Sequence, residues 1–492
     1  MEREVVKVAE SVNELIPIFC RIFKIIKRLR NKYFPGEQLN AIVWFANNNK
    51  LHPESEMSIA YLKETDNVKN ENNIKFDKSN ISSCGGLVIF YKFLKRIGLE
   101  KLLKNKLSLE IGKSGNKTNV PVVERLMSLI LSITGGFHRM YHVDYLKDNM
   151  QFRTVKAGLF SFASTTLSRT LKKFCEIHVQ ELYSVFHKLL KRVLKGTRKI
   201  TIDVDSTVTS VYGNQDGAMK GYNPHKRGLK SYHPLLAFIY EKKLLLHGIL
   251  RPGNSHTSFG VKNFIRDALL KLPEGVNKIF LRGDSGFYKS DFINYLENRG
   301  RIIRYVIKIK MKNMVSNLRL GAIKDWKDIG TGLSISETTY KAPKWNKPRR
   351  IVVVRKEIKY NDKELLLPHT GYEFFCFVTN ITWKPETVLH FYNKRAGAEN
   401  YIKDFKYGYG WGKILTYKYW ANKVIFVSTM FAYNLSNLFF SDICLEKDKT
   451  IISLRLKYIY QAATISYSGR KYILHFERGS PLKEPYQKLL SA

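Results

Sequence analysis

The sequence contains few cysteines, and none is spaced as a metal ligand or as part of a disulfide framework. Five occur in 492 residues, without a CxxC pair: Cys20, Cys84, Cys175, Cys376 and Cys444. This scarcity excludes a small disulfide-stapled scaffold and a cysteine-ligated zinc site. The charged N-terminus, MEREVVKVAE, lacks the apolar segment of a signal peptide. Both absences predict a protein of the reducing cytoplasm.

Acidic residues are also scarce relative to basic ones. Lysine and arginine number 83 against 42 aspartates and glutamates, which gives a formal charge of +41. A chain with this excess repels itself when compact, so we expect it to bind a polyanion. We favour nucleic acid as that polyanion. An anionic membrane surface or a ribosomal setting is the alternative.

Long uninterrupted apolar segments are absent as well. The most apolar stretch, VIFVSTMFAYNLSNLFF, spans Val424 to Phe440 and contains Asn434, Ser436 and Asn437. These polar residues favour a buried core helix over a membrane span. We therefore expect no membrane-spanning segment and assign no membrane partner. A hydrophobic content of 44% with 13% aromatic residues instead predicts a folded globular chain.

Two mostly helical regions precede the first strand pattern. Residues 1–75 contain a basic amphipathic pattern, RIFKIIKRLRNKYF (Arg21 to Phe34), followed by a polar linker. Residues 76–195 form a second helical region, which we interpret as DNA-binding. Within it, STTLSRTLKKF (Ser164 to Phe174) begins with hydroxyl residues suited to a helix N-cap and carries three cations. This pattern is typical of the second helix of a helix-turn-helix, with a plain basic surface helix as the alternative.

Strand patterns followed by a helical pattern predict an α/β fold from residue 196 onwards. The strand-like segments are KITIDVD (Lys199 to Asp205), KLLLHGILRPG (Lys243 to Gly253) and KIFLRGDSGFY (Lys278 to Tyr288). A strand followed by a helix indicates a sheet with functional groups at its strand ends. We assign residues 196–302 to the first part of this α/β core.

The next residues change in character. Residues 303–384 are rich in strand patterns, such as RRIVVVRKEIKY (Arg349 to Tyr360) and YEFFCFVTNI (Tyr372 to Ile381). They predict a β-rich insertion within the α/β core. Residues 385–445 then form the second part of the core, and residues 446–492 are expected to form a C-terminal helical region.

One helix of the second core part has an unusual polar face. It is expected to start near Pro385 and to end by Gly408, and it includes YNKRAGAENYIKDFK. At about 100° per residue, four side chains would share an arc of about 60°: Tyr392, Arg395, Glu399 and Lys406. An ordinary amphipathic helix reserves such an arc for leucine and isoleucine, so this face indicates a functional site.

Three acids from distant parts of the chain are candidate metal ligands. Asp205 ends the first strand, Asp284 ends a later strand, and Glu399 lies on the polar helix face. Carboxylates without histidine or cysteine favour magnesium or manganese. Two such ions can activate a water or hydroxyl and stabilise the leaving oxygen of a phosphodiester. Asp203 shares the strand face of Asp205 and is the alternative first ligand.

Other polar residues would complete such a site. Tyr392, Arg395 and Lys406 are candidates for binding the phosphates of a cleaved strand, and a solvated charged stripe is the alternative. His233 in SYHP and Arg251 in RPGN either line the site or hold its loops.

Three blocks of the sequence resemble a known family in the same order. Tyr392, Arg395, Glu399 and Lys406 match the Y-x2-R-x3-E-x6-K signature of the DDE transposases of bacterial insertion sequences, transposase group 1. DVDST and RGDSGFY resemble the first and second aspartate motifs of these enzymes, and GYNPHKRGLKSYHPLL between them also looks familial. The resemblance spans roughly residues 80–440, whereas the first seventy or so residues match nothing that we can place.

The resemblance implies a fold and an activity. The fold is an RNase H-like catalytic core interrupted by a β-rich insertion, with Asp205, Asp284 and Glu399 as the catalytic and metal-binding acids. The activity is magnesium-dependent cleavage at element ends, followed by joining of the 3′ hydroxyl to target DNA. Trp345, in the insertion, would stack on a displaced base, or it would be an ordinary core residue.

The implied partners are double-stranded DNA, as terminal inverted repeats and target, and a second copy of the chain in the DNA complex. The implied location is the bacterial cytoplasm, at the nucleoid. Two rival functions stay open on the sequence: a nuclease of the same fold that cuts without joining, and a transposase-derived DNA-binding protein without catalysis.

Overall fold

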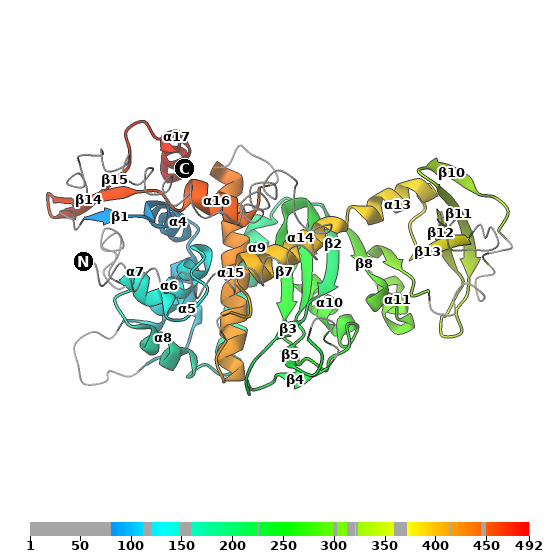
Figure 1. Cartoon of the computed structure of the whole chain (residues 1–492), viewed down its shortest axis with the longest axis horizontal. Coiled ribbons are helices and arrows are strands. Elements are labelled where there is room, and N and C mark those ends of the chain that lie inside the picture. Colours follow the sequence, from blue (N-terminus) through cyan, green and yellow to red (C-terminus); the bar gives the residue numbers. More distant parts are fainter. Residues whose placement is uncertain are drawn as a thin grey trace, which may run out of the picture. The chain divides into compact units, whose positions relative to one another are not determined.

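The computed structural model describes residues 80–111, 120–147, 159–221, 223, 226–298, 303–311, 320, 323–358, 371–413, 415–443 and 449–491 (Figure 1). The predicted basic helix at Arg21 to Phe34, and the rest of the first 79 residues, lie outside this description. Residues 79–492 form one compact unit.

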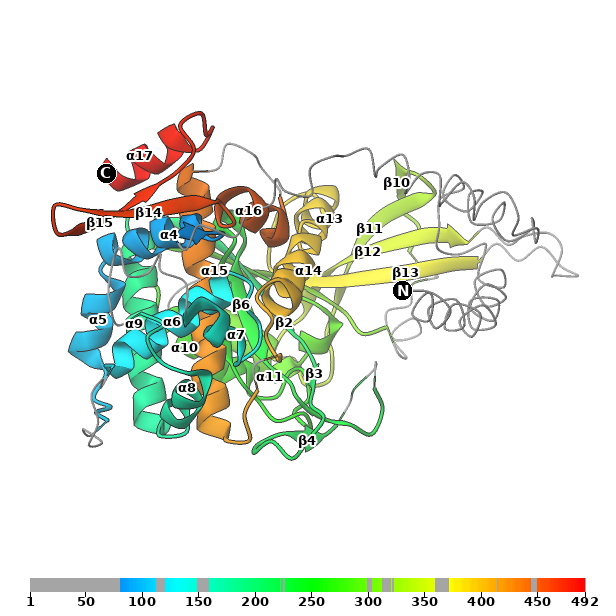
Figure 2. The same cartoon turned by 60° about the vertical axis from the view of Figure 1, so that its left-hand side comes forward.

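The described residues contain one mixed sheet of nine strands, in the order β10-β11-β12-β13-β9-β8-β2-β6-β7 (Figures 1 and 2). Strands β2, β8 and β9 run parallel to one another, whereas β6, β7 and the four strands β10–β13 pair antiparallel. The strands are β2 (Lys199–Ser206), β6 (Leu235–Ile239), β7 (Leu244–Ile249), β8 (Lys278–Gly283), β9 (Ile303–Lys308), β10 (Lys327–Gly330), β11 (Leu333–Tyr340), β12 (Arg349–Ile358) and β13 (Gly371–Thr379).

Helices cover the central strands of the sheet, which explains why these strands are buried on both faces. Strand β2 is buried from Ile200 to Val204, on both of its faces. Alternation predicted its apolar residues on one face, but covered strands bury both faces. The helices are α4 (Gly85–Arg96), α5 (Leu99–Lys106), α6 (Val122–Thr134), α7 (His142–Lys147), α8 (Ser164–Leu171), α9 (Glu176–Val193), α10 (Val261–Leu270), α11 (Ser290–Glu297), α13 (Pro385–Asn393), α14 (Ala396–Lys403), α15 (Tyr419–Ile443), α16 (Ile451–Tyr458) and α17 (Lys483–Ser491).

Helix α15 packs at the centre of the helical layer. It packs against α6, α9 and strand β7, and nearly all of its residues between Ala421 and Ser436 are buried. By length and composition alone it could cross a membrane, yet 83% of its most apolar window is buried inside the protein. That burial is typical of a core helix, as predicted for the Val424–Phe440 stretch. Its Asn434 has internal partners, because Oδ1 accepts the N–H of Leu245 at 2.7 Å and Nδ2 donates to the carbonyl of Leu245 at 2.8 Å.

The segment 303–384, predicted to be rich in strands, contains β9–β13, and these strands join the core sheet. Strand β9 (Ile303–Lys308) lies within the range assigned to the insertion, but it pairs in parallel with β8 and belongs to the core. Strands β10–β13 then extend the same sheet, because β13 pairs with β9 through Thr379, Val378 and Phe377. The described strands of residues 303–384 therefore share one sheet with the core, and the bounds of the insertion stay a prediction.

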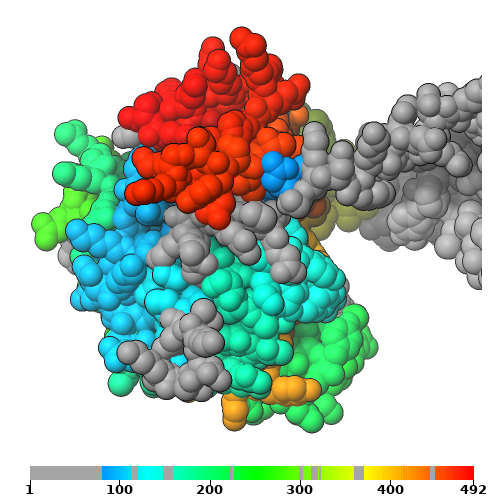
Figure 3. Space-filling view, turned by 90° about the vertical axis from the view of Figure 1, so that its left-hand side faces the viewer, coloured from blue at the N-terminus to red at the C-terminus, as the bar shows by residue number. Residues whose placement is uncertain are grey.

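The C-terminal region is only partly helical, which corrects the expectation for residues 446–492. A β-hairpin of β14 (Ala463–Ser468) and β15 (Lys471–His475) lies between α16 and α17. Its inner strand pairs with β1 (Ile81–Ser82), far away in sequence. Figure 3 shows this C-terminal segment lying over the helices that follow residue 80.

The helix-turn-helix stays a prediction, because residues 148–158, which lie between α7 and α8, are outside the described part of the chain. Helix α8 itself forms as expected. A helix-turn-helix joins its two helices by three or four residues. A four-residue connection follows α8 and leads to α9, which packs against α15. The cations of this segment, Arg169, Lys172 and Lys173, are exposed.

Candidate active site

Two of the predicted acids leave neighbouring parallel strands at the same edge of the sheet. Strand β2 pairs with β8 so that Val204 lies opposite Gly283. Each strand then delivers an aspartate at the next position, Asp205 from β2 and Asp284 from β8. Adjacent strands lie about 4.8 Å apart, so the register alone brings the two carboxylates side by side. This strand pairing therefore brings together two residues that lie 79 positions apart in the sequence.

The backbone fixes both aspartates. Asp284 caps a short 3-10 helix, η4 (Ser285–Phe287), and its Oδ1 accepts the N–H of Gly286 at 2.9 Å. Asp205 Oδ1 accepts the N–H of Ser206 at 2.7 Å. Each carboxylate therefore keeps one oxygen on a backbone donor and presents the other to its surroundings.

The second oxygen of Asp205 is paired with Arg395. The distance from the guanidinium Nη2 to Asp205 Oδ2 is 2.8 Å, and both side chains are largely buried. Arg395 thus lies at the acids, as the signature implies, but in this structure its guanidinium is engaged by protein rather than open to phosphate. Lys406 is likewise engaged, because its Nζ donates to the carbonyl of Val208 at 2.7 Å.

The predicted single helix from Pro385 to Gly408 is divided into three pieces. Helix α13 ends at Asn393, α14 begins at Ala396, and the last turn, η6 (Asp404–Gly408), is a π-helix. Between α13 and α14 the backbone tightens, since Arg395 N bonds Tyr392 O at 2.8 Å. A fixed 100° per residue does not hold across these breaks, so the shared arc is wrong as a geometry.

The structure places the four signature residues differently from one another. Tyr392 is half-buried with its ring 4.5 Å from that of Phe377, and Arg395 is buried. Glu399 is exposed in the first turn of α14. Lys406 lies in the π turn. The signature therefore combines a half-buried tyrosine, a buried arginine, an exposed acid and an amine that is anchored to the backbone.

The charges of the site are coupled. Burial raises the pKa of Asp205 to about 6; Arg395 opposes this shift, while Asp284 and Glu399 add to it. Burial likewise raises the pKa of Tyr392 to about 12, and its charged neighbours include Arg395, Asp284 and Asp205. The negative charges of Asp284 and Glu399 therefore repel that of Asp205, and a bound cation would reduce this repulsion.

The donor set suits a hard cation, although it is not arranged as a finished metal site. All candidate ligands are carboxylate oxygens, which magnesium and manganese prefer. Among the described residues, no group of three histidine, cysteine, aspartate or glutamate side chains stands close enough to hold an ion. Asp205 and Asp284 are adjacent, and Glu399 interacts with Asp205 through its charge.

Asp203, the alternative first ligand, is engaged in a buried ion pair in this structure. Both of its oxygens bind Arg282, at 2.6 and 2.7 Å, and both side chains are completely buried. The guanidinium also donates to the carbonyl of Phe391 at 2.6 Å and lies between the rings of Tyr240 and Phe391. Asp203 has no oxygen left for a metal.

Sequence reasoning missed this pair, although a signal was present. Asp203 lies two positions before Asp205, and Arg282 lies two positions before Asp284. Parallel pairing of the two motifs puts Asp203 directly opposite Arg282. Aligning the two aspartate motifs by that offset would have predicted the ion pair.

Comparison with known families now decides the identity of the chain. The sequence profile of the family described as transposase DDE domain group 1 matches residues 66–492. The chain belongs to this family. It is a DNA transposase, an enzyme that cleaves and transfers DNA strands. Enzymes of the family generally use divalent metal ions.

Comparison with solved structures and curated proteins adds little to this. A cryo-EM structure of a piggyBac transposase synaptic complex with hairpin DNA is similar over 76% of this chain and 79% of that chain. Its sequence identity is 12% and the TM-score is 0.43, which is too weak to support an inference. No curated protein sequence matches the chain.

Of the two readings of Trp345 that the sequence left open, the structure of the transposase favours a core residue. Its side chain is 3% exposed. The indole packs edge-on against Tyr288 and Tyr340, and Arg349 lies 4.8 Å from its ring centroid. A base cannot reach a face that is already covered by these neighbours.

His233 and Arg251 of the transposase hold the loops beside the first aspartate motif. The Nε2 of His233 lies 3.0 Å from the hydroxyl of Ser206, next to Asp205, and its Nδ1 lies 2.7 Å from the carbonyl of Ser255. Arg251 donates to the carbonyls of His233 and Phe259 at 3.0 and 2.7 Å. Of the two readings left open by the sequence, these contacts favour a structural role.

We predict that Asp203→Asn destabilises the transposase by about 3–5 kcal/mol, because it leaves the buried charge of Arg282 without its partner. Chemical denaturation measures this. The control is Asp216→Asn, whose exposed pair with Lys418 at 3.9 Å should contribute less than about 0.5 kcal/mol. A stable but inactive Asp203→Asn protein would restore Asp203 as a ligand.

We also predict that Asp205→Asn stabilises the protein above pH 6. The folded pKa of Asp205, about 6, lies above the ordinary value of 3.8. Its contribution to stability is therefore complete below pH 3.8 and is lost as the pH rises through 6. Removing the charge should raise the free energy of unfolding by up to about 3 kcal/mol at high pH, because the pKa of about 6 already includes the opposing effect of Arg395.

Denaturation at several pH values measures this difference between Asp205→Asn and wild type. It should be small near pH 4 and grow as the pH rises to about 6, as the linkage requires. A difference of the opposite sign, or one that is independent of pH, would contradict the assigned charge coupling.

Proposed function

We propose that Asp205, Asp284 and Glu399 form the catalytic centre for cleavage at the ends of a DNA element and for 3′-hydroxyl strand transfer into target DNA. One observation carries the proposal: the β2–β8 register puts Asp205 beside Asp284. The raised pKa of Asp205, to which both Asp284 and Glu399 contribute, adds to it. Glu399 is thus close enough to Asp205 for the two charges to interact.

The strand order supports an RNase H-like core. Strands β7, β6 and β2 form an antiparallel meander, and β8 and β9 continue from β2 in parallel. In this arrangement the first acid comes from the central strand and the second from its parallel neighbour. Strands β10–β13 enter between β9 and α13, which is where the resemblance expects the insertion.

The three carboxylates would hold two magnesium or manganese ions. When bound, the ions would activate a water or hydroxyl and stabilise the leaving oxygen. Backbone donors hold one oxygen of Asp205 and one of Asp284, which fixes the direction of both carboxylates; the second oxygen of Asp205 would have to exchange Arg395 for the cation. Glu399, exposed at the start of α14, would complete the set.

Arg395 would serve both the acid and the substrate. Its guanidinium balances Asp205 in this structure, at 2.8 Å. With a cation at the carboxylates, its donors could turn to a phosphate of the cleaved strand. Tyr392 lies beside it, and Lys406, anchored to Val208 after β2, would bind a phosphate farther along the strand. Forked donors fix a phosphate in both position and angle.

The partner would be double-stranded DNA, as terminal inverted repeats and as target, with two copies of the chain in the complex. The charge of +41 supports a DNA partner. The exposed cations Arg169, Lys172 and Lys173 make the segment around α8 a candidate for contacting the duplex. The location would be the bacterial cytoplasm, at the nucleoid.

We predict that Asp205→Asn, Asp284→Asn and Glu399→Gln each abolish metal-dependent cleavage of a duplex carrying the element end, while duplex affinity changes by less than about threefold. Each variant removes a ligand charge without removing a basic residue. Gel-based cleavage and fluorescence anisotropy measure the two effects. Asp216→Asn, an exposed acid, is the control.

The same assay separates the rival functions. Cleavage followed by joined products supports the transposase, whereas cleavage without joining would indicate a nuclease. Binding without cleavage in the wild-type protein would indicate an inactive DNA-binding protein. Full cleavage by Glu399→Gln would remove that residue from the centre.

We further predict that Arg395→Lys slows cleavage at least about tenfold, because lysine keeps the charge but cannot make the forked contact. Duplex affinity should stay near that of wild type. Single-turnover cleavage measures the effect. The matched control is Lys394→Arg at the exposed neighbouring position. Equal rates for the two variants would show that Arg395 acts through charge alone.

A further inference from the structure

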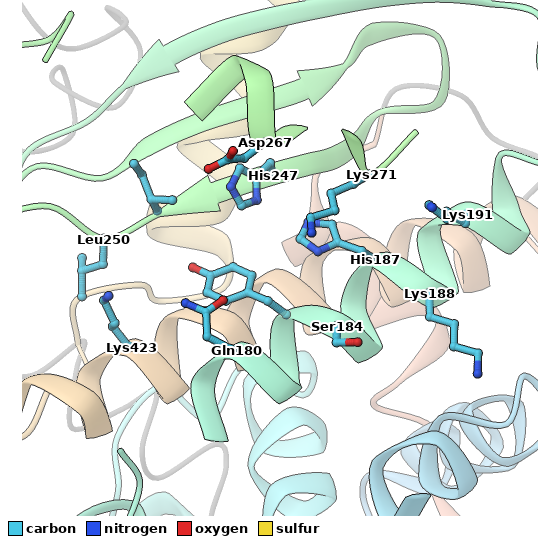
Figure 4. A pocket seen from close by; sticks show the side chains of 12 residues that line it. Gln180, Ser184, His187, Lys188, Lys191, His247, Leu250, Asp267, Lys271 and Lys423 are labelled. Carbon is cyan, nitrogen blue, oxygen red and sulfur yellow. The ribbon is translucent and has the colours of Figure 1, made fainter. Parts of the chain in front are cut away.

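A second concave site lies at the edge strand β7, where β6 separates it from β2 and the first aspartate motif. Its volume is about 510 Å³, within the range of ligand pockets. Helices α9, α10 and α15 meet strand β7 there (Figure 4). We call it the lysine pocket, and the residues that line it and are used below are Tyr183, His187, Lys191, His247, Lys271 and Lys423.

The pocket is strongly basic. Four lysines line it against one acid, Asp267. Lys271 and Lys191 both lower the pKa of His187, so their charges reach into the interior of the pocket. Lys423 is half-buried, with its ammonium near the rings of Tyr419 and Trp420. Cations gathered in a concavity with low-dielectric walls attract an anion more strongly than cations on open surface.

Two buried histidines form the wall of the pocket. The rings of His187 and His247 lie 5.2 Å apart, and the side chains are 4% and 7% exposed. Within the described chain, neither ring nitrogen of His187 finds a partner at normal hydrogen-bond geometry, and nor does Nδ1 of His247. A hydrogen bond with the backbone of Tyr183, too poorly aligned to meet that geometry, raises the pKa of His187 against the larger effect of burial.

Both histidines are neutral donors at ordinary pH. Burial is the largest cause of lowered pKa values in both, to about 2 for His187 and about 4 for His247. Neighbouring lysines lower both further, whereas Asp267 opposes the shift at His247. A neutral imidazole offers one N–H, which suits an anion that accepts hydrogen bonds.

Packing alone does not account for these side chains. His187 stacks on Tyr183, and His247 stacks on Phe264 at 5.0 Å, which apolar rings would do equally well. Buried ring nitrogens without partners are costly when nothing binds them, so their presence calls for a function. Figure 4 shows His187 and Lys271 directed to the same part of the pocket.

We propose that the lysine pocket binds a phosphate group, held by Lys191 and Lys271 together with the imidazole N–H groups of His187 and His247. The chemistry matches, since phosphate oxygens accept both charged and neutral donors. A phosphodiester of the DNA backbone and a small phosphorylated molecule are the two sources of such a group. The phosphate site itself does not depend on the carboxylate centre, whereas its occupation by DNA rests on the proposed function.

Histidine signals of the full chain test this directly. NMR of protein labelled at histidine follows His187 and His247, assigned through His187→Gln and His247→Gln, with exposed His475 as the reference. Inorganic phosphate, added against chloride at equal ionic strength, should shift both signals and raise the titration midpoint of His247 above about 4, because an anion favours imidazolium.

Further additions identify the source of the phosphate. A duplex that displaces inorganic phosphate and shifts both signals identifies the DNA backbone. Saturation by inorganic phosphate or a nucleoside monophosphate, with no response to duplex, identifies a small phosphorylated ligand. No shift with any of the three overturns the proposal. Because no cleavage is measured, failure of the carboxylate assignment cannot produce this negative result.

A matched pair of variants tests the lysines. Lys191→Gln/Lys271→Gln removes two charges from the pocket, and Lys195→Gln/Lys262→Gln removes two from the end of α9 and from α10 outside it. The pocket variant should bind inorganic phosphate at least tenfold more weakly than the control variant. If DNA is the source, the slope of log affinity against log salt for duplex binding should become shallower in the pocket variant, by about one more than in the control variant. Equal phosphate affinity for the two variants overturns the proposal.

Discussion

The buried ion pair of Arg282 with Asp203 constrains the whole catalytic region. A guanidinium that is completely removed from water must have its charge and its donors satisfied inside the protein. Asp203 supplies two oxygens from β2, the carbonyl of Phe391 supplies a third from α13, and β8 supplies the arginine itself. The three segments that carry the predicted acids are therefore joined at one point.

The site has one part whose charges are balanced within the protein and another part whose charges are not. Asp203 and Arg282 are matched in charge and closed to solvent. Two positions further along, Asp205 is less well matched, because Asp284 and Glu399 oppose its ionisation while Arg395 supports it. Unbalanced negative charge of this kind is favourable for a site that binds a cation, and it costs stability in the free protein.

The sequence predicted features that depend on local pattern and missed those that depend on distant partners. Strands β2, β7, β8, β12 and β13 follow from apolar runs and their turn residues. The break before Ala396 and the hairpin at 463–475 do not follow from such runs, because packing decides them. The burial of Asp203 and of Trp345 could not be predicted for the same reason. Their burial is set by Arg282 and by Tyr288, Tyr340 and Arg349, and pattern alone does not reveal those contacts.

The continuous sheet has a consequence for the four strands β10–β13. A parallel core that ended at β9 would present a row of unpaired backbone groups, which invites pairing with other chains. Strand β13 covers that edge through Thr379, Val378 and Phe377. Arg350 and Glu337, one on each of two outer strands, place charges farther along the same sheet. The four strands thus protect the edge of β9 from pairing with another chain. A truncated chain without them would be prone to self-association even with its catalytic residues intact.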